Sequence, residues 1–275
     1  ILDMVRDLFK FPISSHYYHE ERRFTFGFGG IPYGVQLLIL GTVAVFCLQL
    51  ALDVPYGSAA GAAPGGWLLE WVDFSVADVV NFQIWGLFTY MFIHSGLSHL
   101  FWNMLTLFIA GPEVERTLGS RQFLRFYLYC GVIGALANFI PTLLFGAPAI
   151  PVIGASGAAL GTLVAFAVID PERQFFLFPI PFPITARGVV IIIVALNVAS
   201  AVTGGGGPVA VTTHLGGMAA GFAYMKVRPR IARWQLQRRI DRRQNRQENK
   251  PKSEDEEKLA EAIDNIFKFQ DRDRK

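Results

Sequence analysis

The sequence predicts an all-α membrane protein, a bundle that crosses the bilayer six times. Three observations lead to this fold class. Of the 275 residues, 52% are hydrophobic, 24 are phenylalanine and 17% are charged, which is too apolar for a soluble domain of this length. Six apolar segments approach the ~20 residues that a membrane-spanning helix needs. The basic residues outside these segments fall at the termini and in alternate connections.

The predicted spans follow one another from residue 35 onward. Residues 1–33 mix charged, aromatic and glycine residues, and we expect an N-terminal cytosolic or interfacial arm. Residues 34–227 would form the six-span core, and residues 228–275 a cytosolic tail, first basic and then acidic and helical. The expected spans are Val35–Leu52, Leu87–Ala110, Phe123–Leu144, Ile153–Ile169, Thr185–Val202 and Val209–Val227.

The connections differ in length and charge. The first, Asp53–Trp85, is long and tryptophan-rich, so we expect it at the membrane interface or packed on the protein. The second is expected to cover Gly111–Gln122 and to hold four charged residues. The connections after the first, third and fifth spans contain no Lys or Arg. By the positive-inside rule, both termini are then cytosolic, as an even number of spans requires, in a multi-pass protein of the cell (inner) membrane.

Polar side chains lie near the outer ends of the even-numbered spans. Ser156 begins the fourth span between Gly154 and Gly157, while His99 and Asn103 share one face of the second, and His214 is close to the start of the sixth. These spans all run inward, so at ~1.5 Å per residue the polar groups lie at a common depth. Because polar groups in lipid are costly, we expect them to face one another or a cavity.

Glycines on two of these spans would allow close contact. Gly217 and Gly221 share a helical face with His214, and Gly157 and Gly161 repeat the spacing in the fourth span. Ordinary helix packing also explains these glycines. Close packing would in turn let Ser156 and His214 share a hydrogen bond of ~2.6–3.2 Å.

Together these motifs resemble the rhomboid family of intramembrane serine proteases. The resemblance covers the six-span core and is carried by His94-x4-His99-x3-Asn103, Glu115-Arg116, Gly154-x-Ser156-Gly157 and His214-Leu-Gly-Gly-x3-Gly221. It implies that Ser156 is the nucleophile and His214 the general base. It also implies that His99, Asn103 and the Ser156 backbone N–H form the oxyanion site, that His94 is structural, and that Glu115 anchors packing at the cytosolic end.

Two positions differ from the pattern common in the family. Leu160 stands four residues after the serine, where many relatives carry an aromatic residue that stacks on the histidine. Gly86 follows Trp85 where many relatives have arginine. Neither position performs chemistry, but both bear on the rigidity of the site.

The expected chemistry is peptide hydrolysis by a Ser-His dyad, because the nearest acidic residue, Asp170, lies at the opposite end of the fourth span. Substrates would be transmembrane proteins, cleaved where their helices unwind near the outer surface. We expect no cofactor and no metal.

Other functions remain as alternatives. Three histidines could bind zinc, but the sequence lacks His-Glu-x-x-His, and His94 and His99 would lie ~140° apart on a helix. A non-proteolytic rhomboid-like protein that binds membrane proteins or serves their quality control is the main alternative. A transporter is disfavoured because the spans lack acidic residues. Nucleic acid is not an expected partner, since the basic run adjoins a span; that run could contact anionic lipid or a protein.

Overall fold

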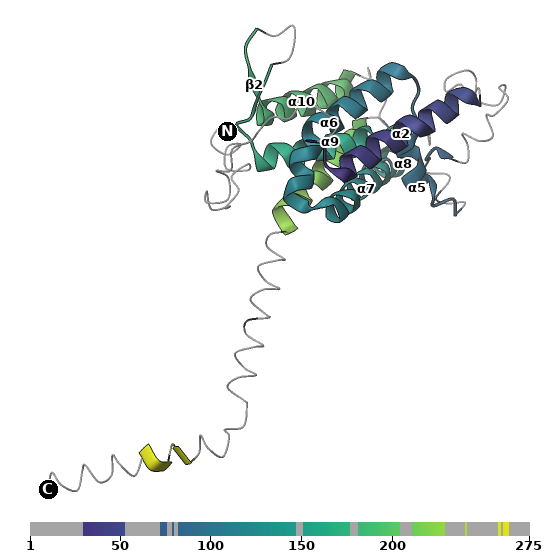
Figure 1. Cartoon of the computed structure of the whole chain (residues 1–275). Coiled ribbons are helices and arrows are strands. Elements are labelled where there is room, and N and C mark those ends of the chain that lie inside the picture. The colour runs from purple at the N-terminus through teal and green to yellow at the C-terminus, as the bar shows by residue number, and fades with distance from the viewer. Residues whose placement is uncertain are drawn as a thin grey trace, which may run out of the picture. The chain divides into compact units, whose positions relative to one another are not determined.

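A computed structural model describes residues 30–52, 72–75, 79, 82–146, 151–176, 181–203, 211–228, 240, 258–259 and 261–263. The chain divides into two compact units, Ile1–Lys226 and Val227–Lys275. Figure 1 shows the first as a bundle of helices. In the second unit, residues 240, 258–259 and 261–263 are helical. The predicted arm, except residues 30–33, and most of the predicted tail lie outside the described residues, as does Gly204–Pro208.

Long helices occur where the sequence predicts spans, with shorter elements between them. The long ones are α2 (Tyr33–Ala51), α6 (Leu97–Leu118), α7 (Ser120–Leu136), α9 (Ser156–Ile169), α10 (Ala186–Thr203) and helical residues 211–228. The shorter elements are α5 (Gly86–Thr89), η3 (Tyr90–Phe92), α8 (Phe139–Phe145) and the antiparallel strands β1 (Gln174–Phe175) and β2 (Ile184–Thr185). The predicted all-α class is thus confirmed at the level of a mainly helical fold.

The predicted bounds of the second span are wrong at both ends. The chain forms α5 and η3 first, becomes extended at Gly96, and starts α6 only at Leu97. The helix then continues eight residues past Ala110 to Leu118, through the charged residues assigned to a loop. It ends at Gly119, whose φ of 81° lies in the left-handed region that glycine tolerates. The predicted connection Gly111–Gln122 is therefore reduced to a single turn.

The third predicted span is divided into two helices. The long helix α7 ends at Leu136, and the chain turns at residues 137 and 138 before α8 begins. The Asn138 side-chain amide donates to the Ala135 carbonyl at 3.1 Å and to Thr213 Oγ1 at 2.7 Å. Asn138 thus replaces helical backbone bonding at this turn and ties it to the last helix of the bundle.

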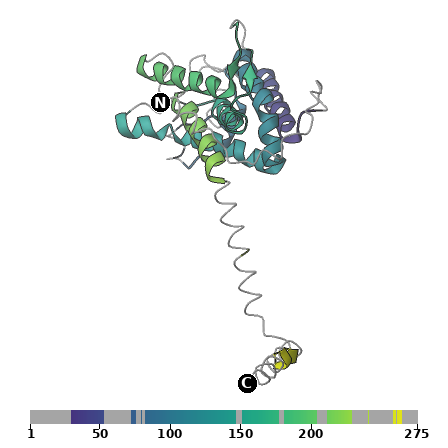
Figure 2. The ribbon, with the colours of Figure 1, turned by 90° about the vertical axis from the view of Figure 1, so that its left-hand side faces the viewer.

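Helix α9 forms the centre of the bundle. It packs most extensively on α6 and α7, and also on α10 (Figure 1, Figure 2). Its residues from Gly157 to Val168 are buried, except for Leu160. Small side chains over this stretch let the surrounding helices approach closely.

Three described helical stretches are long and apolar enough to cross a membrane. They are Tyr33–Ala51, Ser120–Leu144 and Ala186–Thr203, and much of their surface is exposed on the outside of the bundle. The apolar helix α9 is shorter, at 14 residues. These apolar helices indicate a membrane protein, while crossing six times stays a prediction.

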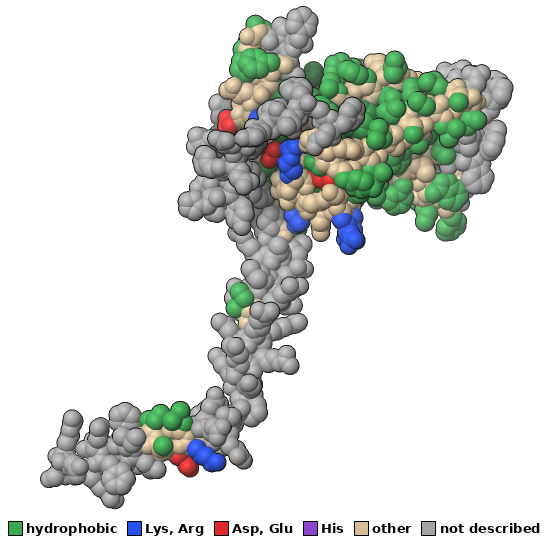
Figure 3. Space-filling view, in the orientation of Figure 1, with side chains coloured by type: hydrophobic (Ala, Val, Ile, Leu, Met, Phe, Trp, Pro, Cys, Tyr) green, Lys and Arg blue, Asp and Glu red, His purple; other side chains and the backbone are tan. Residues whose placement is uncertain are grey.

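Charged side chains gather at one end of the bundle. Apart from Asp73, those described in the first unit lie in the C-terminal parts of α6 and residues 211–228, the N-terminal parts of α7 and α10, and the segment after α9. On the face seen in Figure 3, hydrophobic side chains are spread over the part of the bundle away from these charged residues. A bundle with an apolar surface and one charged end fits a bilayer boundary at that end.

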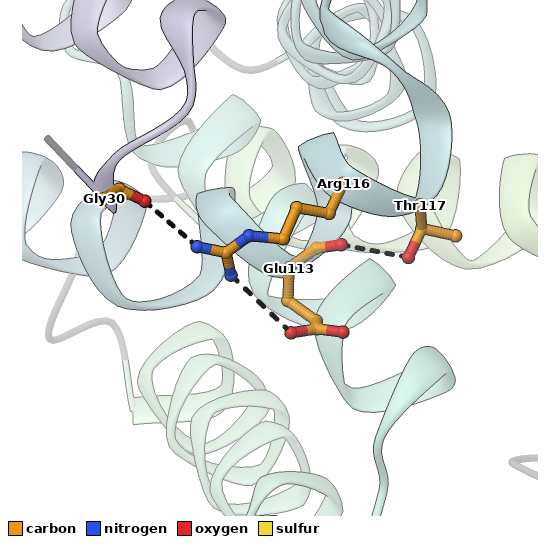
Figure 4. A network of polar contacts seen from close by, with 4 residues as sticks. All are labelled: Gly30, Glu113, Arg116 and Thr117. Carbon is orange, nitrogen blue, oxygen red and sulfur yellow. Dashed lines mark hydrogen bonds and ion pairs between the residues drawn. The ribbon is translucent and has the colours of Figure 1, made fainter. Parts of the chain in front are cut away.

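Glu115 holds the start of α2 at this charged end. The side chain is 2% exposed, and its two carboxylate oxygens each accept a hydrogen bond of 2.7 Å, from the backbone N–H groups of Gly34 and Val35. A carboxylate at a helix N-terminus satisfies unpaired N–H groups and opposes the helix dipole. Beside it, Arg116 donates to the Gly30 carbonyl at 3.0 Å (Figure 4). The structure therefore gives Glu115 a definite packing contact.

Candidate active site

Ser156 is the first residue of α9, at the end of the helix that lies away from the charged end. The preceding Gly154 has a φ of 103°, a conformation that glycine adopts without strain. A Cβ atom added to Gly154 would lie 2.6 Å from Nε2 of His99, so the imidazole packs directly on the glycine backbone. Both the turn and this contact require glycine before the serine.

His214 faces Ser156 from the helix of residues 211–228. Its Nε2 lies 2.8 Å from Ser156 Oγ, so the predicted hydrogen bond is present in the structure. Both residues are partly buried. The paired hydroxyl and imidazole are the groups that nucleophilic catalysis requires.

Glycine contacts between the two helices make this approach possible. A Cβ atom at Gly161 would lie 2.7 Å from the Gly217 carbonyl oxygen, and one at Gly217 or Gly221 would overlap the backbone of Gly157 or Gly161. The helices are parallel and in register, because Gly157 meets Gly217 and Gly161 meets Gly221. The small-residue faces predicted from the spacing are the faces in contact.

His214 has a second partner that the sequence analysis missed. Its Nδ1 lies 2.9 Å from Oδ1 of Asn197, a residue of α10. The available signal was a single amide in a helix otherwise rich in Val, Ile and Ala. A polar residue in such a segment indicates a partner inside the bundle.

His94 and His99 lie together beside the turn before Ser156. His94 is completely buried, and its Nε2 is 3.5 Å from the backbone N of Ala155. The ring of His99 meets it edge-on at 5.0 Å between centroids, and Ser95 Oγ lies 3.1 Å from His99 Nδ1. Gln49 of α2 holds the His94 backbone through bonds of 2.9 and 3.3 Å. His94 thus supports the turn that carries the serine.

Asn103 is placed differently from the other polar residues of the site. It is buried, and its side-chain amide donates to the His99 carbonyl one turn earlier, at 3.0 Å. One of its two amide protons is used in this bond, which leaves the second for another acceptor.

The sequence argued against a zinc site because His94 and His99 would lie ~140° apart on one helix. That argument is wrong, because His94 precedes α6 and its ring lies near that of His99. Within the described part of the chain, however, no three His, Cys, Asp or Glu side chains are grouped as metal ligands.

Gly86 also has a packing role. A Cβ atom there would lie 2.6 Å from the Asp73 carbonyl oxygen, so α5 closely approaches the backbone of the preceding segment, residues 72–75. Next to it, Phe74 and Val152 exchange backbone hydrogen bonds of 3.2 and 2.7 Å, which joins that segment to the chain leading into Ser156. Residues 72–75, α5 and the chain leading into Ser156 are therefore connected by backbone contacts.

The chain is similar to known proteins over this same region. The family model for the rhomboid domain matches residues 81–230. Rhomboid protease GluP of Bacillus subtilis is 36% identical over 139 residues, covering 50% of this chain and 25% of that protein. Rhomboid protease GlpG of Salmonella paratyphi A is 28% identical over 159 residues, covering 57% of this chain and 52% of GlpG. Inactive RHOMBOID-like protein 8 of Arabidopsis thaliana is 34% identical over 85 residues, covering 29% of this chain and 24% of that protein.

The matches span a quarter to about half of the length of these relatives. The family model covers more than half of this chain and contains the turn with Gly154, Ser156 and the helix with His214. The resemblance drawn from the sequence motifs is thereby confirmed: the chain belongs to the rhomboid family.

Proposed function

We propose that the chain is an intramembrane serine endopeptidase that cleaves transmembrane-helix substrates near their outer end. The observation that carries this proposal is the 2.8 Å separation between Ser156 Oγ and His214 Nε2. It occurs at the end of the bundle opposite the charged residues. Membership of a family in which several relatives are named proteases supports the same activity.

The chemistry follows from these two side chains. Ser156 Oγ attacks the peptide carbonyl carbon while its proton moves to His214 Nε2. When the C–N bond breaks, His214 gives the proton to the leaving amine, and the acyl group stays on Ser156. A water molecule then loses a proton to His214 and attacks the acyl carbon. The bond from that carbon to Ser156 Oγ breaks, His214 returns the proton to Oγ, and the acid is released.

The negative oxygen formed in each step needs hydrogen-bond donors. We assign this role to the Ser156 backbone N–H, His99 and the free amide proton of Asn103. The start of α9 favours this assignment, because the first N–H groups of a helix have no partner within it. Loss of one such donor typically lowers kcat by about 10²- to 10³-fold.

We propose six crossings with both termini in the cytosol. The grouping of charged side chains at one end of the bundle supports this orientation. The site then lies just below the outer surface, and the membrane lipid surrounds α2 and α10. A substrate helix would unwind there to present an extended backbone.

A non-proteolytic binding role is the second candidate, favoured by the similarity to a relative named as inactive. Labelling of membranes with a fluorophosphonate probe separates the two. We expect labelling of the wild-type chain and none of Ser156→Ala, with His214→Ala strongly reduced. Equal labelling of wild type and Ser156→Ala would overturn the proposed protease.

A further inference from the structure

Asn197 contacts the proposed base directly. Among the described residues of α10, those that are buried, Ala186 and Val190, lie in the first two turns. Asn197 is further along, where the neighbouring Leu196 and Val198 are exposed. It is nevertheless partly buried, because its side chain points to His214 and forms the 2.9 Å contact with Nδ1.

The hydrogen bonds of Asn197 fix which end of its amide faces the histidine. Its Nδ2 lies 2.8 Å from the carbonyl oxygen of Ile193, one turn earlier in α10. A carbonyl accepts only from a donor, so the NH₂ group must be on that side. The oxygen Oδ1 therefore faces His214.

This orientation determines the tautomer of the imidazole. Because Oδ1 can only accept, His214 Nδ1 must carry a proton and donate it to Asn197. In the neutral ring Nε2 then has a free lone pair, directed at Ser156 Oγ 2.8 Å away. That is the form in which His214 can take the serine proton; the other tautomer would present a proton to the hydroxyl.

Three other described residues that could be considered for this role do not supply the restraint. Leu160, one turn after Ser156, has no polar group and no aromatic face to stack on the imidazole. Asp170 follows the far end of α9. The ring of His99 of α6 packs on Gly154.

We propose that Asn197 is the positioning residue of the site, which holds His214 in the tautomer and orientation needed for a general base. This inference rests on the proposed protease function and turns the Ser-His dyad into a Ser-His-Asn arrangement. In such an arrangement the third group orients the base and stabilises the imidazolium that forms.

The test uses the full chain in membranes and a fluorophosphonate probe, with the rate of Ser156 labelling measured against pH and probe concentration. We expect Asn197→Ala to lower the maximal labelling rate roughly 10- to 100-fold, by analogy with the loss of hydrogen-bond partners of metal-bound histidines. Its half-saturating probe concentration should stay within about twofold of wild type.

Asn197→Asp gives a readout that a purely structural role would not change. Its carboxylate can accept the same proton and favours the charged ring, so the acid limb of the rate profile should move to higher pH by about one unit or more. The matched control is Thr203→Ala, since Thr203 of α10 also donates to a carbonyl one turn earlier, at 2.9 Å to Ala199. This control should label like wild type.

The possible outcomes are distinct. The positioning role is overturned if Asn197→Ala labels within about twofold of wild type, or if the acid limb of Asn197→Asp does not move. In either case, the proposed protease function stands as long as wild-type labelling depends on Ser156. Absence of Ser156-dependent labelling in the wild type overturns both proposals. If Asn197→Ala does not accumulate, the acid limb of Asn197→Asp alone decides.

Discussion

Replacing Gly161 by alanine should separate the two helices that carry the proposed catalytic pair. The new methyl would lie 2.7 Å from the Gly217 carbonyl oxygen, 2.8 Å from Cys130 Cβ and 2.9 Å from Cys130 Sγ. Ordinary van der Waals contact for a Cβ atom begins near 3.4 Å, so the helices must move apart by about 0.7 Å. Overpacking of this kind costs about 1–3 kcal/mol.

The same movement should reach the site, because Gly161 is less than two turns from Ser156. If α9 and residues 211–228 separate by that amount, the 2.8 Å bond between Ser156 and His214 lengthens beyond the ~3.2 Å limit of a good hydrogen bond. We therefore expect both lower stability and slower fluorophosphonate labelling.

Gly41→Ala is the matched control for this variant. A Cβ atom there has no neighbour within 4 Å, and the glycine lies inside α2. Alanine should stabilise that helix by about 0.5–1 kcal/mol and leave labelling unchanged. Thermal unfolding in detergent and the labelling rate are measured for both. Gly161→Ala with wild-type stability and labelling would show that the helix contact does not control the site.

Three further predictions concern packing around the bundle. Glu115→Ala should lower the free energy of unfolding by about 2–5 kcal/mol, because two buried N–H groups of α2 lose their acceptor; denaturation in detergent measures it, and a loss below about 0.5 kcal/mol would contradict it. Gly86→Ala, whose Cβ would lie 2.6 Å from Asp73 O, should lower the melting temperature by several degrees, and a melting temperature equal to that of wild type would refute the contact. Asn138→Ala should cost about 1–3 kcal/mol by removing the 2.7 Å bond to Thr213; unfolding at the wild-type midpoint would exclude this role.

Periodicity and depth were sufficient to predict that Ser156 and His214 come together. Ser156 and His214 sit near the starts of helices that run in the same direction, so equal distances from those starts place them at one level. The glycine spacing then specified which faces meet. These features are local in the sequence, which is why sequence reasoning could reach them.

Features that depend on tertiary contacts were harder to predict. The charged end of α6 looks like a loop until Glu115 is seen to bind the start of α2, some eighty residues earlier in the chain. Asn197 looks like an isolated amide until α10 is placed next to His214. In both cases the partner of the polar group lies on a different helix, and no local pattern identifies it.

The chemistry of the site explains why its helices are less typical of membrane spans than their neighbours. Helix α6 carries His99 and Asn103, α9 is only 14 residues long, and residues 211–228 carry His214 among glycines. Polar groups and small residues reduce hydropathy, so such helices cannot face lipid at low cost. They pack against α2, α7 and α10; α2, α10 and the stretch Ser120–Leu144, which joins α7 to α8, meet the hydropathy and length of a span. For the membrane placement proposed above, this arrangement reduces the cost of a polar site by surrounding it with helices whose exposed surface is apolar.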